Sequence, residues 1–122
     1  MSERGQGDPP FFYRSDAPGV PRKLADGVFS RVFFGERVML SIVTIEPNTE
    51  APIHSHPNEQ WGYLLEGAWE RYQDGAWVQC KAGDFWCTPG GVEHGGRTRG
   101  EKAVVLDVFS PPREEYKESN LP

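Results

Sequence analysis

Turn-forming residues recur along this chain at a nearly constant spacing, and the segments between them are too short for ordinary helices. Strands about eight to ten residues apart, with no amphipathic helix among them, are typical of a β-sandwich or a small barrel. The sequence therefore predicts an all-β, antiparallel fold. The expected strands cover residues 28–34, 38–45, 53–56, 60–65, 68–73, 77–81, 84–88 and 102–109.

The length of 122 residues suits a single domain with one core. Residues 21–112 are expected to form the barrel, because they contain all the predicted strands. Residues 1–20 are expected to form an N-terminal arm that is partly mobile, since the first ten are polar, glycine-containing and end in Pro-Pro. Residues 113–122 form a polar C-terminal tail with at most one helical turn.

The formal net charge of -5 argues against nucleic acid or an anionic membrane as partner, because both attract basic surfaces. A small molecule is the expected partner. No apolar run approaches membrane-spanning length, and the N-terminus lacks the apolar core of a signal peptide. A cytoplasmic location is expected.

Three histidines stand out, because two of them have strand spacing. His54 and His56 lie two residues apart, so a strand would direct both imidazoles to one side. His94 follows a proline and glycine turn in a second segment. Two imidazoles on one side of a sheet are half of a metal site, and the fold would have to bring His94 to the same place.

These two segments resemble the paired motifs of the cupin superfamily, whose members are antiparallel jelly-roll barrels, also called double-stranded β-helices. The resemblance implies one divalent metal ion per chain, held inside the barrel by three histidines and a carboxylate. Zinc, manganese, iron, nickel and cobalt all suit such nitrogen and oxygen ligands. The implied ligands are His54, His56 and His94, with Gln60 at the acidic position. The matching residues are His54, His56, Gln60 and Gly67 in the first motif, and Gly83, Pro89, Gly91 and His94 in the second.

Gln60 departs from the cupin pattern, and Glu59 is a rival ligand one residue earlier. The pleat of a strand places Gln60 on the histidine side and Glu59 on the other, although a kink at Pro57 would break that parity. A neutral amide leaves the metal site more positive than a carboxylate would. This favours Lewis-acid chemistry over oxygen activation.

Asp107 is the next candidate, because alternation puts it between Val105 and Phe109 on an apolar face. A carboxylate in that position has a raised affinity for protons unless a cation compensates, which suits a general acid or base. The other interpretation is a structural salt bridge with an arginine. The candidates are Arg31, Arg71 and Arg113.

The segment from Leu106 to Arg113 resembles the tail of pectin-degradation cupins that ketonise 4,5-unsaturated monouronates. The resemblance implies catalytic roles for Asp107, Phe109 and Arg113, with Arg113 as a clamp for the substrate carboxylate. An isomerase or lyase type of proton transfer on a small carboxylated, sugar-like substrate is therefore expected. The alternatives are a metal-dependent dioxygenase and a non-catalytic cupin that binds a small molecule.

A homodimer is expected from exposed strand edges and from the aromatic segment at residues 11–13. Trp61 and Tyr63 face away from the histidines on the predicted strand. We therefore assign these two rings to packing and not to substrate binding.

Overall fold

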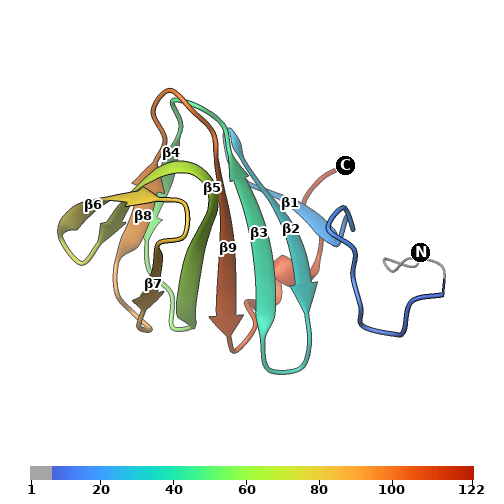
Figure 1. The fold of residues 1–122 in the computed structure, drawn as a ribbon. Helices are drawn as coiled ribbons and strands as arrows, with labels where there is room; N and C mark the ends of the chain where they lie inside the picture. The colour runs from blue at the N-terminus through green and yellow to red at the C-terminus, as the bar shows by residue number, and fades with distance from the viewer. Residues whose placement is uncertain (1–6) are drawn as a thin grey trace.

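The computed structural model of the chain describes residues 7–122 and shows one antiparallel sheet of nine strands, curled into a barrel-like shape (Figure 1). This confirms the all-β prediction. In residues 7–122, no helix has the length and apolar character needed to cross a membrane. Part of the expected mobile arm, residues 1–6, lies outside the described residues. The elements are β1 (Val20–Ala25), β2 (Val28–Phe34), β3 (Met39–Ile45), β4 (Glu50–His54), β5 (Glu59–Gln73), β6 (Ala76–Lys81), β7 (Phe85–Thr88), β8 (His94–Arg97), β9 (Ala103–Ser110) and the 3-10 helix η1 (Glu114–Lys117).

Strand β5 organises the sheet, because it pairs with four other strands. Its first half pairs with β7 and β9, and its second half pairs with β6 and β8. The order along the sheet is β1-β2-β3-β9-β5-β8-β4, with β6 and β7 joined to β5 outside this path. A single long strand therefore belongs to both walls of the curled sheet.

The prediction of two separate strands at 60–65 and 68–73 was wrong. Pairing with β9 continues through the expected turn, where Glu66 lies opposite Val104 and Gly67 opposite Ala103. The register shifts between Leu64 and Glu66, and Gly67 has a φ of +87°. Glycine adopts that conformation without strain, so this segment bends the strand instead of ending it.

Strands β1 and β8 were not predicted. The sequence of β8 is His-Gly-Gly-Arg, which is typical of a loop. Gly96 is needed there because a Cβ atom would lie 2.1 Å from the Trp69 ring, and pairing with both β4 and β5 holds the strand in place. Strand β1 contains Pro21, which an edge strand tolerates because it lacks a second pairing partner.

The C-terminal tail lies along β1. Arg22 Nη1 donates hydrogen bonds to the carbonyl oxygens of Glu115 and Glu118, at 2.7 and 2.5 Å. The Asn120 side chain bonds both the main-chain N–H and the carbonyl of Lys23. These contacts hold η1 against the barrel, next to the inner face of the sheet.

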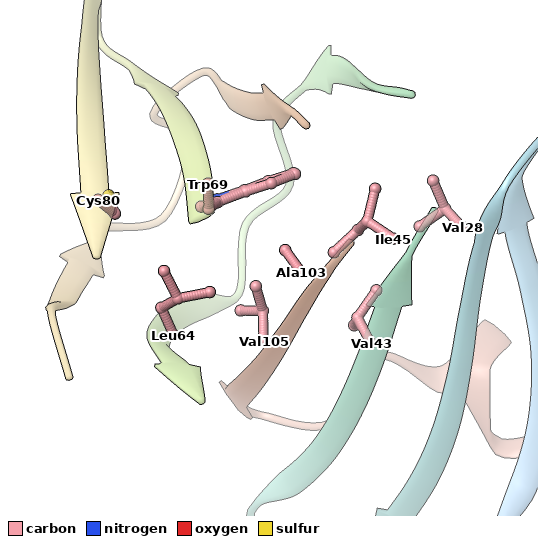
Figure 2. Close-up of a cluster of buried hydrophobic side chains, with 8 residues drawn as sticks. All are labelled: Val28, Val43, Ile45, Leu64, Trp69, Cys80, Ala103 and Val105. Carbon is pink, nitrogen blue, oxygen red and sulfur yellow. The ribbon is translucent and has the colours of Figure 1, made fainter. Parts of the chain in front are cut away.

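Apolar residues on the inner face form the core (Figure 2). The alternation of strand side chains fills the centre with aliphatic residues, as a half-buried antiparallel sheet requires. A smaller group of Val32, Met39 and Phe109 continues the core toward the tail. The main cluster consists of Val28, Val43, Ile45, Leu64, Trp69, Cys80, Ala103 and Val105.

Much of the opposite face of β3, β9, β5 and β7 is also apolar, and its side chains are exposed or half-buried. The register places Ile42, Leu106, Tyr63 and Phe85 in one row across the four strands. The Tyr63 and Phe85 rings are stacked at 6.3 Å. We call this surface the outer apolar patch; it consists of Leu40, Ile42, Trp61, Tyr63, Phe85, Leu106 and Val108.

Candidate functional site

The three histidines meet where β4 ends and β8 begins. His54 is the last residue of β4 and His94 is the first of β8, and the register places them opposite each other. The ring centroids are 4.5 Å apart for His54 and His94, 4.8 Å for His56 and His94, and 5.5 Å for His54 and His56. One ring nitrogen from each residue lies within 4.8 Å of the other two. The antiparallel pairing therefore brings together residues 40 positions apart in the sequence.

The loop that carries His56 is tied to the loop before β8. The Gly91 N–H donates to the carbonyl oxygen of His56 at 2.8 Å. A Cβ atom on Gly90 would lie 2.3 Å from the Pro57 carbonyl oxygen, so only glycine permits this close approach. The glycine segment of the second motif thus fixes the position of the first.

Each imidazole is oriented by a hydrogen bond from Nδ1 to a main-chain carbonyl two residues away. His54 donates to Pro52, His56 to Asn58 and His94 to Val92, at 2.9, 3.1 and 2.9 Å. A neutral imidazole protonated on Nδ1 has its lone pair on Nε2. All three Nε2 atoms are therefore available as metal ligands, and such Nδ1 bonds are the usual support of ligating histidines.

Burial favours the neutral form of His56 and His94, which is the form that a metal requires. Burial lowers the pKa of His94 to about 4, and its Nε2 atom is buried without a hydrogen-bond partner. Burial also lowers the pKa of His56, followed by the nearby charge of Arg113. His54 is exposed and lies at the mouth of the site. A buried lone pair without a donor fits a cation better than it fits a structural histidine.

Gln60 faces the histidines, and Glu59 does not. Gln60 is 4% exposed, whereas Glu59 is on the outer surface and accepts a hydrogen bond from Trp61 Nε1 at 3.1 Å. The Gln60 side chain forms a hydrogen bond with the Asp107 carboxylate. A carboxylate can only accept, so Gln60 donates from its NH2 group, and its oxygen is directed toward the histidines. The structure thus places the two side chains as the pleat predicted; the ligand role of Gln60 stays a prediction.

The contact between Gln60 and His56 also fits a cation. Gln60 Oε1 and His56 Nε2 lie 2.9 Å apart, although both are acceptors when His56 carries its proton on Nδ1. Two lone pairs that face each other in this way repel unless a cation lies beside both atoms. Three imidazoles and one amide oxygen therefore form a donor set that could hold a divalent ion.

A cavity of about 250 Å³ opens beside the histidines, and Asp107 lines it. Burial raises the pKa of Asp107 to about 6, while Arg71, Gln60 and Arg113 act in the opposite direction. Asp107 Oδ1 is buried without a hydrogen-bond partner. A carboxyl group in this state can exchange a proton with a molecule in the cavity.

The alternative of a structural salt bridge at Asp107 is not supported. Within residues 7–122, no arginine nitrogen lies within 4.0 Å of the Asp107 carboxylate. Arg31 donates instead to the carbonyl oxygens of Ser15 and Ala17. Asp107 therefore lacks the short ion pair that would explain its burial on structural grounds alone.

Arg113 and Phe109 line the same cavity. Arg113 donates to Glu115 Oε1 at 2.8 Å and to the Tyr116 hydroxyl at 2.9 Å. Its guanidinium lies 4.4 Å from the centre of the Tyr116 ring, and the Phe109 ring packs edge-on against His56 at 5.7 Å. The structure thus places six of the seven predicted site residues along one cavity, and the seventh, His56, packs against His94 and Phe109 beside it. Their catalytic roles stay predictions.

Sequence reasoning did not assign two residues to this cavity, Arg71 and Tyr116. Arg71 was considered only as a salt-bridge partner, although its spacing of two from Trp69 would direct both side chains inward on β5. Tyr116 lies in residues 113–122, for which the sequence predicts a polar tail. The sequence indicates a role for Tyr116 only weakly. The ring lies three residues after Arg113, and the two side chains are in contact only if the tail forms a helical turn.

A protein-family sequence model described as "Cupin domain" matches residues 41–109, which include both histidine segments. H2HPP isomerase of Bacillus subtilis is 32% identical over 95 residues. The aligned region makes up 75% of this chain and 40% of that protein. This chain therefore spans less than half the length of that relative.

Two solved structures are similar to this one. An RmlC-like cupin from Shewanella frigidimarina superposes with a TM-score of 0.78 at 24% identity, covering 89% of this chain and 96% of that one. KdgF from Halomonas sp. superposes with a TM-score of 0.73 at 24% identity, covering 78% and 90%. These are similarities of fold.

Proposed function

The chain belongs to the Cupin domain family, and on this basis we propose that it is a metal-dependent enzyme that transfers protons on a small carboxylated, sugar-like substrate. Ketonisation of a 4,5-unsaturated uronate is the reaction that we propose to test first. The observation that carries the proposal is the meeting of three imidazoles and the buried Asp107 carboxyl around one cavity. The similarity to an isomerase and to KdgF supports the same reaction class.

Each of the seven candidate site residues has a distinct part in the proposed reaction. His54, His56, His94 and Gln60 would hold a divalent ion, which would supply Lewis acidity toward a substrate oxygen. Asp107 exchanges a proton with the substrate carbon, because its buried Oδ1 atom has no hydrogen-bond partner among the described residues and its pKa is raised. Arg113 binds the substrate carboxylate through its guanidinium fork. Phe109 forms an apolar wall of the cavity.

Replacing Asp107 with asparagine should lower kcat for ketonisation by about 100-fold or more, since a general acid or base contributes roughly 10²–10⁴-fold. The amide keeps the size of the side chain and removes a charge that is costly to bury, so the variant should fold. Activity is followed by the loss of the conjugated double-bond absorbance of the unsaturated uronate.

The matched control is Asp26→Asn, because the Asp26 side chain is fully exposed and, within residues 7–122, pairs with Lys23 alone. Its rate should equal that of the wild type. Equal rates for Asp107→Asn and the wild type would remove Asp107 from the mechanism. Oxygen consumption in the same assay would instead support a dioxygenase, and stabilisation by sugar acids without turnover would support a binding protein.

We also propose that the outer apolar patch is the interface of a homodimer. Trp61, Tyr63 and Phe85 are 45, 42 and 67% exposed, and the seven residues of the patch include no charged side chain. A continuous apolar surface across four strands is unusual for a monomer. A second copy fits it, because a two-fold axis matches a flat apolar face with itself.

The double substitution Tyr63→Glu and Phe85→Glu should convert a dimer of the 13.7 kDa chain into a monomer, because it buries opposed carboxylates in the interface. Sedimentation velocity measures the change. Val78→Glu is the control, since Val78 is 55% exposed on β6 and does not belong to the patch. A monomeric wild type would contradict the proposal.

A further inference from the structure

The side chain of Arg71 is charged and buried, and it lines the same cavity as the histidines. Only 6% of the residue is exposed. A buried guanidinium is costly unless a carboxylate or another anion compensates it. In the described part of the chain, no carboxylate oxygen lies within 4.0 Å of Arg71.

The guanidinium is held in place by neutral groups. Arg71 Nη2 donates to Thr88 Oγ1 at 2.8 Å, and Thr88 Oγ1 donates to Gln73 Oε1 at 2.6 Å. The face of the Trp86 ring lies 5.3 Å from the guanidinium carbon. Arg71 Nε is buried without a hydrogen-bond partner. The group is therefore fixed in position and keeps a free donor.

The two arginines of the cavity differ in their charge balance. Arg113 has a carboxylate partner, because Glu115 lies 2.8 Å away. Among the described residues, Arg71 has only longer-range attractions, to Asp107 and to Cys80, and it lies close enough to His94 to lower the pKa of that histidine. Arg71 thus leaves positive charge near the histidines, whereas the charge of Arg113 is already balanced by the Glu115 carboxylate.

Unpartnered polar atoms concentrate around this cavity. Six buried side-chain nitrogen and oxygen atoms of residues 7–122 lack a hydrogen-bond partner, and four of them belong to residues that line it. The four are Trp69 Nε1, Arg71 Nε, His94 Nε2 and Asp107 Oδ1. Buried polar groups in proteins are normally satisfied, so this concentration indicates a polar ligand.

We propose that Arg71 binds a second acidic group of the substrate, deep in the cavity, so that the preferred substrate is a compact polyhydroxy diacid. The 4,5-unsaturated uronate of the first assay has only the carboxylate that Arg113 binds. Arg113 then binds one carboxylate at the tail side, and Arg71 binds the other beside the histidines. The inference rests on the proposed function for the role of Arg113. The cavity volume of about 250 Å³ lies below the roughly 300–1,000 Å³ of common ligand pockets, which suits a substrate of this size.

The test compares two six-carbon acids that differ at one end, D-glucarate with two carboxylates and D-gluconate with one. Calorimetric titration of the metal-loaded wild type should give a Kd for glucarate at least about 10-fold below that for gluconate, because a charge-assisted bidentate pair is added. Arg71→Met should weaken glucarate binding until the ratio is close to one, and should leave gluconate unchanged. Arg113→Met should weaken both ligands.

Arg71→Lys serves as the second variant, because it keeps the charge and loses the planar fork. Its preference for glucarate over gluconate should lie between those of the wild type and Arg71→Met. If the methionine variant does not fold, the lysine variant is used to test the proposal. An unchanged preference in either folded variant would overturn the proposal, as would equal or undetectable binding of the two acids by the wild type. Failure of the uronate assay with a retained, Arg71-dependent glucarate preference would reject the proposed reaction and keep the diacid site.

Discussion

Replacing His94 with alanine should reduce bound metal from about one ion per chain to almost none. His94 is the most buried of the three histidines, at 1% exposed, and it contributes an Nε2 atom without any protein partner. Loss of a hydrogen-bond partner of a metal ligand already lowers affinity by about 10–100-fold, so loss of the ligand itself should exceed 100-fold. Elemental analysis of the purified protein measures the occupancy, and competition with a chromophoric chelator measures the Kd for zinc.

The paired variant is Gln60→Glu, which replaces the neutral amide oxygen with a carboxylate at the same position. It should bind zinc more tightly than the wild type, because a negative ligand is added to a neutral set. Circular dichroism establishes that both variants are folded. Wild-type zinc affinity in folded His94→Ala protein would show that the cluster is not the metal site.

Replacing Gly67 with alanine should destabilise the fold by about 4 kcal/mol or more, from two separate causes. Gly67 has a φ of +87°, which an L side chain rarely adopts. Its Cβ atom would also lie 2.0 Å from the carbonyl oxygen of Lys102, which belongs to the backbone and cannot rotate away. Urea unfolding monitored by tryptophan fluorescence measures the loss.

Gly75→Ala separates the two causes. Gly75 has the same φ of +87°, but nothing lies within 4 Å of the added Cβ atom. This variant should lose only about 1 kcal/mol, the cost of the backbone conformation. Equal losses for the two variants would mean that strand β9 moves away and that the close contact at Gly67 does not hold the bend.

The strand pattern could be predicted where side chains alternate. Strand β2 begins and ends where the sequence predicted it, and Asp74-Gly75 joins β5 to β6 between the strands predicted at 68–73 and 77–81. Alternation also placed Val105, Asp107 and Phe109 on the inner face of β9. These features depend on neighbouring residues, whose local periodicity is visible in the sequence.

Features that depend on partner strands could not be predicted. The glycines of β8 look like a loop until the Trp69 ring is seen against Gly96. The bend at Gly67 looks like a turn until β9 is seen to pair across it. The tail looks unstructured until its hydrogen bonds to β1 bring Tyr116 to the cavity. In each case the deciding contact comes from a residue distant in the sequence.

The sequence by itself determined the donor chemistry of this protein: three imidazoles, one amide and one carboxylate in two spaced motifs and one apolar strand. Residue types and motif spacing are sufficient for that, but the pleat predicted for His54 and His56 was wrong, because β4 ends at His54 and His56 lies in the loop that Gly91 holds. The pairing of β4 with β8 brings His94 opposite His54, and burial on β5 leaves Arg71 in the same cavity with no carboxylate within 4.0 Å among residues 7–122. Strand register and burial decide such placements, and both arise from pairing across the whole sheet.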